Sequence, residues 1–169
     1  MTIDRVVLVG FMAAGKSAVG ERLAELLGWR FIDLDREIER QCDTSVAEIF
    51  AQRGEVAFRE LEAEATSQVS GIRPAVIAPG GGWALRPGLV ETLRPALVVR
   101  LRVSAEEAVR RARSTTAMRP LLAAADPLGR ARTLLAARDA EYARADAAVE
   151  TEGRSIDDIA REIYNLVRG

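Results

Sequence analysis

The sequence predicts an α/β fold in which a parallel β-sheet carries helices on both faces. Three observations support this fold class. Short apolar segments alternate with helical segments along nearly the whole chain. The first apolar segment, Val6–Val9, is a continuous run, which is typical of a strand buried on both faces. A glycine-rich loop follows this segment, at the end of a strand where ligands bind in such sheets.

The N-terminal half is expected to contain three strands and four helices. Gly28 predicts the end of the first helix, and Ser45-Val46-Ala47-Glu48 is a capping box that predicts the start of the third. The expected strands are 6–9, 31–34 and 75–78, and the expected helices are 16–27, a helix from about 36, 46–50 and 54–69.

The C-terminal half is expected to contain two strands and three helices. Ser104 and Ser155 stand where they would cap the helices that follow them, and Pro127 is suited to the first turn of another. Residues 114–126 show no periodicity and predict a loop. The expected strands are 97–101 and 147–150, and the expected helices are one from 105, 127–143 and 156–167.

Composition narrows the function classes. A chain of 169 residues without a linker predicts one domain over residues 1–169. The net charge of −1 argues against a nucleic-acid partner, and the lack of a long apolar run argues against a membrane partner. Residues 1–5 lack the pattern of a signal peptide, so a cytoplasmic location is expected. One cysteine and no histidine exclude a disulfide framework, a serine–histidine triad and a cysteine-rich zinc site.

The strand at 6–9 leads into Gly10-Phe11-Met12-Ala13-Ala14-Gly15-Lys16-Ser17, and a helix follows. This matches the phosphate-binding pattern G-x-x-x-x-G-K-[ST] in its strand–loop–helix context. Backbone N–H groups and the helix N-terminus would bind phosphate, Lys16 would reach the outer phosphates, and the Ser17 hydroxyl would bind Mg²⁺. Lys16 is the single lysine among 24 basic residues, which favours a position that requires a compact charge.

Two carboxylates follow the second strand. In Phe31-Ile32-Asp33-Leu34-Asp35, residues two apart on a strand would point the same way, so Asp33 and Asp35 are expected above the phosphate loop. One would hold the Mg²⁺ shell and the other would accept or orient a substrate proton. The alternative is that Asp35 only caps a helix beginning at Arg36.

Further candidates are less specific when each is taken alone. Arg59 and Glu62 are three apart on a helix and can pair, either in a site or as a surface ion pair. Gly80-Gly81-Gly82 after a buried strand suggests close approach of a ligand, or a plain turn. Arg119 in the loop is suited to a lid over a transferring phosphoryl group, or lies on an ordinary exposed loop. Arg138 and Tyr142 share the long helix, where a solvated face is the default for any one arginine.

Taken together, the order of phosphate loop, Asp-Leu-Asp, Phe-Arg-x-x-Glu, Gly-Gly-Gly, Arg-Pro-Leu-Leu and Arg-x-x-x-Tyr resembles the shikimate kinases, over about residues 6–167. These are small P-loop kinases of the nucleoside-monophosphate-kinase type. The resemblance implies a three-layer α/β/α fold with a five-stranded parallel sheet in the order 2-3-1-4-5. It also implies transfer of the ATP γ-phosphate to the 3-hydroxyl of shikimate, with Mg²⁺, in chorismate and aromatic amino acid biosynthesis.

The resemblance implies a role at each matching position. Lys16, Asp35 and Arg119 would be catalytic, Asp35 as the base, and Asp33 would act on Mg²⁺ through water beside Ser17. A mobile lid would span about 112–126 and a substrate-binding helical region about 34–62. The ATP-binding residues would be Gly10, Ala13, Ala14, Gly15, Lys16, Ser17, Ala18, Arg111 and Arg119. The shikimate-binding residues would be Asp35, Phe50, Phe58, Arg59, Glu62, Gly80, Gly81, Gly82 and Arg138.

Three positions depart from the family pattern. Ala13 stands where the loop usually has glycine and would be strained if φ is positive. Pro79 removes a backbone donor before the glycine triplet, and Trp83 would either narrow the pocket or pack outside it. A gluconate kinase and a non-catalytic ligand-binding relative are the competing hypotheses, and a monomer is expected.

Overall fold

A computed structural model describes residues 2–114 and 123–169 of the chain. Its core is a five-stranded parallel sheet in the order β2-β3-β1-β4-β5, which confirms both the fold class and the strand order. Val7 of the central strand pairs with Ile77 on one side and Val98 on the other. The strands are β1 (Arg5–Val9), β2 (Arg30–Asp33), β3 (Ala75–Ala78), β4 (Leu97–Arg102) and β5 (Ala147–Glu150).

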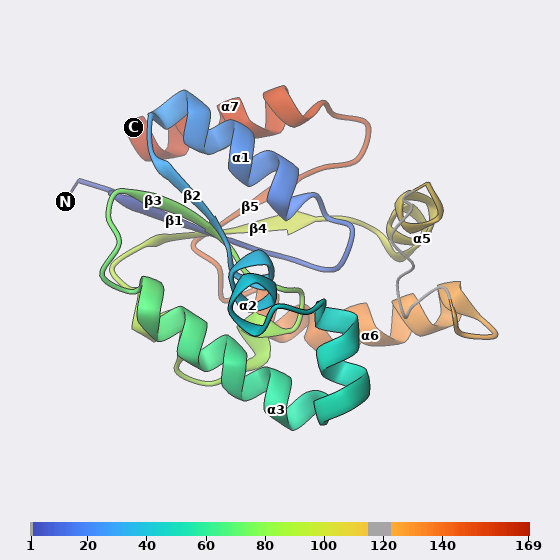
Figure 1. The fold of residues 1–169 in the computed structure, drawn as a ribbon. Coiled ribbons are helices and arrows are strands. Elements are labelled where there is room, and N and C mark those ends of the chain that lie inside the picture. The colour runs from blue at the N-terminus through green and yellow to red at the C-terminus, as the bar shows by residue number, and fades with distance from the viewer. Residues whose placement is uncertain (1, 115–122) are drawn as a thin grey trace.

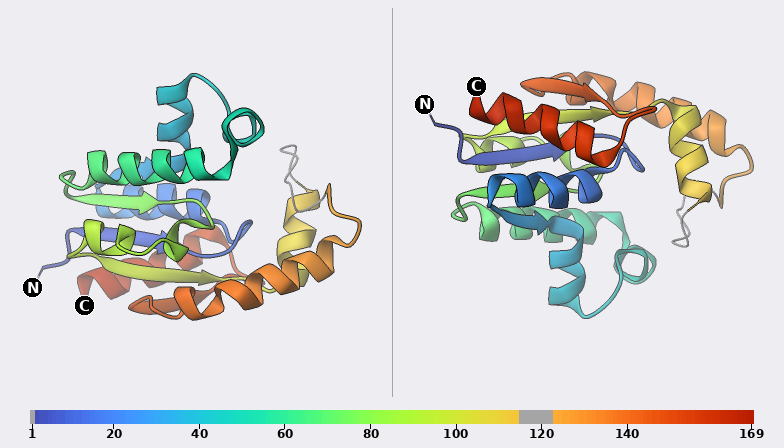
Figure 2. Two further views of the ribbon diagram at one scale, coloured as in Figure 1. Left: turned by 90° about the horizontal axis from the view of Figure 1, so that it is seen from below. Right: turned by 90° about the horizontal axis from the view of Figure 1, so that it is seen from above.

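Helices cover both faces of the sheet (Figure 1). One face carries α1 (Lys16–Leu27) and α7 (Ile156–Arg168), which pack against each other. The other face carries α3 (Val46–Val69), α4 (Leu89–Leu93) and α6 (Pro127–Tyr142). Figure 2 shows α5 (Ala105–Arg113) beyond the carboxyl ends of the strands, whereas α2 (Leu34–Cys42) projects from the edge of the sheet where β2 ends.

The helix α3 combines the two predicted helices 46–50 and 54–69. Its start is the expected capping box, because the Ser45 hydroxyl accepts from the Glu48 N–H and the Glu48 side chain accepts from the Ser45 N–H. Gly54 has φ 81 and ψ 175, which breaks the helix into two pieces with different directions. The kink separates the short piece with Phe50 from the longer piece with Phe58 and Glu62.

The boundary between β2 and α2 differs from the prediction. The strand ends at Asp33, and the helix begins at Leu34 rather than Arg36. The reason is that the Asp33 carboxylate accepts the Arg36 N–H at 3.2 Å and so caps the helix. The argument that Asp33 and Asp35 share a strand face was therefore wrong, and so was the alternative that Asp35 is the cap. Asp35 lies in the first turn of α2.

Two short elements between β3 and β4 were not predicted. They are a 3₁₀ turn, η1 (Trp83–Leu85), and the helix α4, which starts after Gly88 in a left-handed conformation. They were missed because the glycines and prolines of this stretch are typical of turns and interrupt any helical periodicity. Trp83 is fully buried, and its indole N–H donates to the Thr66 hydroxyl at 2.9 Å.

The predicted lid falls mostly where the structure gives no description. Residues 112–114 close α5 and residues 123–126 lead into α6, but Arg119 lies outside the described residues. Within the described parts, none of the helices has the length and apolar character needed to cross a membrane.

Candidate active site

The phosphate loop turns from β1 into α1 through residues 10–15. Gly15 caps α1 with φ 94 and gives no side-chain hydrogen bond, so no side chain of the cap occupies the N–H groups of the first turn. The Lys16 ammonium folds back over the loop and donates to the carbonyl oxygens of Gly10 at 2.7 Å and Phe11 at 3.0 Å. The loop thus forms an anion-binding turn with one compact positive charge on its rim.

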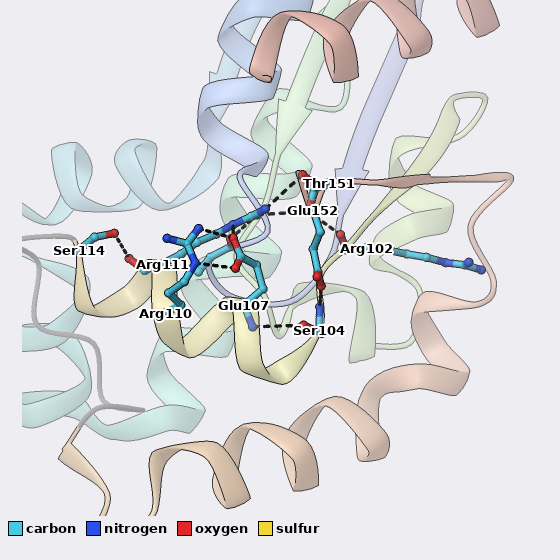
Figure 3. Close-up of polar contacts among 9 residues, drawn as sticks. Arg102, Ser104, Glu107, Arg110, Arg111, Ser114, Thr151 and Glu152 are labelled. Carbon is cyan, nitrogen blue, oxygen red and sulfur yellow. Dashed lines mark hydrogen bonds and ion pairs between the residues drawn. The ribbon is translucent and has the colours of Figure 1, made fainter. Parts of the chain in front are cut away.

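Ala13 has φ 62, a left-handed backbone that an alanine adopts at a cost. Its carbonyl accepts a hydrogen bond from Arg111 at 3.1 Å. Figure 3 shows Arg111 lying between Glu107 of its own helix and Thr151 after β5. Arg111 donates to Glu107 at 2.8 Å and to the Thr151 hydroxyl and carbonyl at 3.2 Å each, so most of its edge is engaged.

Ser17 and Asp33 meet beside the loop. The Ser17 hydroxyl donates to Asp33 Oδ2 at 2.6 Å, which brings the two predicted metal-site residues into contact. Hydroxyl and carboxylate oxygens are the donors that Mg²⁺ prefers. Helix capping by Asp33 Oδ1 holds this carboxylate in place while Oδ2 faces the serine.

Asp35 is the carboxylate with the most perturbed acidity at the site. Burial, together with the nearby charges of Asp33 and Glu62, raises its pKa to about 6, against a smaller opposing effect of Lys16. Its Oδ1 atom is buried and makes no hydrogen bond within the described structure. A Cβ on Gly80 would lie 3.1 Å from this oxygen, so a side chain there would press on the carboxylate.

The two predicted arginines also meet the glycine triplet. A Cβ on Gly82 would lie 2.5 Å from the Arg59 guanidinium, and one on Gly81 would lie 3.5 Å from that of Arg138. A side chain at position 82 would therefore displace the Arg59 guanidinium from its present place against the backbone. Three groups predicted for one substrate, Asp35, Arg138 and Arg59, thus each lie against one glycine of the triplet.

A buried carboxylate holds Arg59. Glu62 is 1% exposed and accepts two hydrogen bonds from Arg59, and burial raises the pKa of its carboxyl against the lowering effect of the arginine. The guanidinium also lies 5.6 Å from the centre of the Phe58 ring. Phe58 is buried and packs on the exposed Phe50 with ring centres 4.6 Å apart. The surface-pair alternative for Arg59 and Glu62 is therefore wrong.

A cleft of about 710 Å³ runs between the phosphate loop, α2, the triplet and α5. The predicted residues on its wall are Ala13, Ala14, Gly15, Lys16, Ser17, Ala18, Asp33, Asp35, Gly80, Gly81 and Arg111. Among the described residues, the predicted ones that do not line this cleft are Gly10, Phe50, Phe58, Arg59, Glu62, Gly82 and Arg138. The cleft also contains residues that the sequence analysis did not single out, among them Ser114, Thr151, Arg154 and Ile156. These polar and aliphatic side chains belong to no motif, so no sequence signal could have found them.

Comparison with known proteins identifies the family to which this set of site residues belongs. The family model for shikimate kinase matches residues 12–168. The chain belongs to the shikimate kinase family. A shikimate kinase from Moorella thermoacetica is 45% identical over 164 residues, 96% of this chain and 94% of that protein. A solved shikimate kinase from Acinetobacter baumannii in complex with shikimate has a TM-score of 0.92 and 36% identity, and covers 99% of this chain and 94% of that one.

A gluconokinase from Sinorhizobium meliloti 1021 is also similar in structure, with a TM-score of 0.55 and 21% identity over 97% of this chain and 91% of that one. At this identity the likeness shows the shared fold alone. The gluconate alternative was therefore reasonable as a fold, while the sequence relatives place the chain among the shikimate kinases.

The three departures of this shikimate kinase family member have distinct structural outcomes. Ala13 does have positive φ, as the strain argument required. Pro79 lines the cleft next to the triplet. Trp83 is not on the cleft wall and is buried among core residues, which settles its two alternatives in favour of packing outside the pocket.

Proposed function

We propose that the chain transfers the γ-phosphate of ATP to the 3-hydroxyl of shikimate, giving shikimate 3-phosphate and ADP on the route to chorismate and the aromatic amino acids. The observation that carries the proposal is the glycine triplet with one acid and two arginines against it. Shikimate is a small carboxylate with adjacent hydroxyls, so it needs both kinds of group in one pocket.

The arginines bind the substrate carboxylate. Planar guanidinium groups suit a carboxylate because two parallel N–H donors match its two oxygens. Glu62 fixes Arg59 from the buried side through one terminal nitrogen, while the other nitrogen contacts the exposed Glu55 at 3.3 Å, a surface ion pair that a substrate carboxylate would replace. Arg138 approaches from α6, with Phe11 under its guanidinium at 5.8 Å from the ring centre. The aromatic pair Phe50 and Phe58 supplies an apolar wall for the ring.

Asp35 binds the ring hydroxyls and accepts the proton of the attacking one. A pKa of about 6 leaves the carboxylate ionised at pH 7, yet basic enough to take a proton as the oxygen attacks. The buried Oδ1 atom of Asp35 accepts no hydrogen bond within the described structure, and a substrate hydroxyl would donate one to it.

ATP occupies the other side of the cleft. The loop and the α1 N-terminus bind the phosphates, and Lys16 moves from its two carbonyl partners to the β- and γ-oxygens. Arg111 lies on the adenine side of the cleft. The N–H groups of its guanidinium are hydrogen-bonded to Glu107 and Thr151 in the guanidinium plane, so the planar face of the group is what can contact the adenine. Arg119 of the lid would neutralise charge on the transferring group.

Ser17, directly, and Asp33, through water, are proposed to hold Mg²⁺. Their oxygen donors and mutual contact fit this ion. Bound Mg²⁺ neutralises charge on the phosphates during transfer. A monomer is part of the proposal, and the use of ATP suits a cytoplasmic location.

The test is an ADP-release assay with shikimate and with gluconate as acceptors. In the presence of ATP, we expect Mg²⁺-dependent turnover with shikimate as the acceptor and no turnover with gluconate. Turnover with gluconate and none with shikimate would overturn the substrate assignment. Binding of shikimate and ATP without ADP release would overturn the assignment as an enzyme. The Lys16→Ala variant is the control for contaminating ATPase.

A further inference from the structure

Tyr142 connects two parts of the substrate pocket that lie far apart in the sequence. It is the last residue of α6 and is 1% exposed. Its hydroxyl donates to the Gly81 carbonyl at 2.5 Å, which ties α6 to the middle of the glycine triplet. A buried phenol needs a hydrogen-bond partner, but packing alone does not require that partner to be the peptide lining the substrate pocket.

Arg138, one helical turn earlier on α6, approaches the same glycine, since a Cβ on Gly81 would lie 3.5 Å from its guanidinium. A phenol has one donor and two acceptor sites, so its proton goes to the Gly81 carbonyl and its lone pairs are left to face the nearby guanidinium. Burial raises the pKa of Tyr142, and the charges of Arg138 and Arg100 act in the opposite direction. The phenol therefore stays protonated and keeps donating to Gly81 throughout the neutral range.

The other side of the tyrosine ring is also fixed. The Arg100 guanidinium lies 5.4 Å from the ring centre and donates to Asp139 at 2.7 Å. The ring thus cannot swing away from the triplet without breaking contacts on β4 and α6. A long arginine side chain loses rotational freedom when it is held, and Arg138 is confined between the Phe11 ring and the Gly81 peptide that Tyr142 anchors.

We propose that Tyr142 is a positioning residue for the acceptor substrate. Its hydroxyl sets the Arg138 guanidinium and the Gly81 peptide at the spacing in which the substrate carboxylate binds. The inference rests on the proposed function, since it presupposes that Arg138 binds that carboxylate. Tyr142 itself does not touch the reacting atoms.

The first experiment compares Tyr142→Phe with the wild type. We expect the KM for shikimate to rise by about 5- to 20-fold, because the Gly81 peptide loses its hydrogen bond and the neighbouring Arg138 is no longer fixed against it. The kcat and the KM for ATP should stay within about twofold of wild type, because the phosphate loop and Asp35 are untouched. The control is Tyr164→Phe, since Tyr164 is the other of the two tyrosines and lies on α7. An unchanged KM for shikimate in Tyr142→Phe would overturn the proposal.

A double-mutant cycle separates positioning from a general structural effect. If Tyr142 acts through Arg138, adding Tyr142→Phe to Arg138→Lys should raise the KM for shikimate by less than about twofold further. Multiplicative effects, or an equal loss of ATP affinity, would indicate a structural role and overturn the proposal. Failure of the proposed function is distinguishable, because the wild type would then not turn over shikimate at all.

A spectroscopic measurement serves even if Tyr142→Phe does not fold. In the Tyr164→Phe protein, Tyr142 is the single tyrosine, so fluorotyrosine incorporated during expression reports on it alone. Shikimate should shift the fluorine resonance as its carboxylate draws on Arg138, whereas an ATP analogue should leave it in place. No shift at saturating shikimate would contradict the inference.

Discussion

Two arginines illustrate the contrast between the two ends of the sheet. Arg5 begins β1 at the amino end, is fully buried, and donates to the carbonyl oxygens of Leu93, Ser70 and Ile72. Arg59 lies at the carboxyl end, keeps 18% of its side chain exposed, and pairs with two carboxylates, those of the buried Glu62 and the exposed Glu55. The two arginines differ both in burial and in the kind of partner. Backbone carbonyls enclose Arg5 as part of the fold, whereas side-chain carboxylates hold Arg59 against Gly82 and leave part of its guanidinium accessible.

The same contrast appears in the carboxylates of the cleft. Asp35 has a buried oxygen without a hydrogen bond and a raised pKa, so it costs the folded state free energy. The cleft end is therefore where stability has been given up for binding and catalysis. Substitutions at the two ends should accordingly affect different measurements.

The largest effect is expected for Asp35→Asn. Loss of the base should lower kcat by a factor of about 10²–10⁴. The fold should survive, because the amide fills the same space without a buried charge. The comparison uses kcat from ADP release and thermal unfolding. Glu37→Gln on the same helix, which pairs with Arg40, is the control. A kcat near that of the wild type would remove Asp35 from the chemistry.

The pH dependence of the free energy of unfolding tests whether the pKa of Asp35 is raised in the folded protein. A carboxyl with a raised folded-state pKa stabilises the fold fully below its unfolded pKa, and this stabilisation is lost as pH rises through about 6. Between pH 4 and pH 7 the wild type should therefore lose up to about 3 kcal/mol relative to Asp35→Asn. Equal stability profiles of the two proteins would contradict the raised pKa.

At the opposite end, Arg5→Met should reverse the pattern. Three carbonyl oxygens lose their donor, so the free energy of unfolding should fall by about 3 kcal/mol. The KM values for both substrates should not change in the protein that remains folded. Denaturant unfolding measures the loss, and Arg30→Met on the exposed edge of β2 is the matched control. A raised KM with intact stability would show that the two ends are not distinct.

Arg59→Ala should affect binding first. It removes one of two carboxylate-binding cations, so the KM for shikimate should rise by about 10- to 100-fold with a smaller change in kcat. The free energy of unfolding should also fall, because the buried carboxyl of Glu62 loses the cation and the hydrogen-bond donor that compensate its burial. Arg53→Ala, an exposed arginine on the same helix, is the control. A level KM would make the carboxylate assignment wrong.

The sequence predicted the cleft end far better than the amino end. Lys16 and Ser17 could be found because one local pattern encodes both loop shape and chemistry. Arg5 could not, since its three partners are backbone atoms 65 to 88 residues away that carry no side-chain signal. Asp33 and Asp35 were assigned to the site for a wrong geometric reason, because helix capping by Asp33 ended the strand early. Thr151 was missed because a threonine after a strand carries no functional signal in the sequence. Its role is visible only in the structure, where Arg111 donates a hydrogen bond to its hydroxyl.

The smallest effect is expected at Ala13, where the cleft end carries backbone strain. Ala13 and Asp43 are the non-glycine residues with left-handed φ in the described structure, at 62 and 51. Ala13→Gly should raise the free energy of unfolding by about 0.5–1 kcal/mol, the left-handed cost of alanine less the entropy of glycine. Asp43→Gly should give a similar gain, because the same backbone cost is relieved there.

The two variants should differ in nucleotide binding. Ala13→Gly loosens a loop that Arg111 holds by the carbonyl of residue 13, so the KM for ATP should shift by about twofold or threefold. Asp43→Gly, at the end of α2, should leave that KM unchanged. A stability gain at 43 with none at 13 would show that the Arg111 contact, and not backbone strain, governs the conformation of the loop.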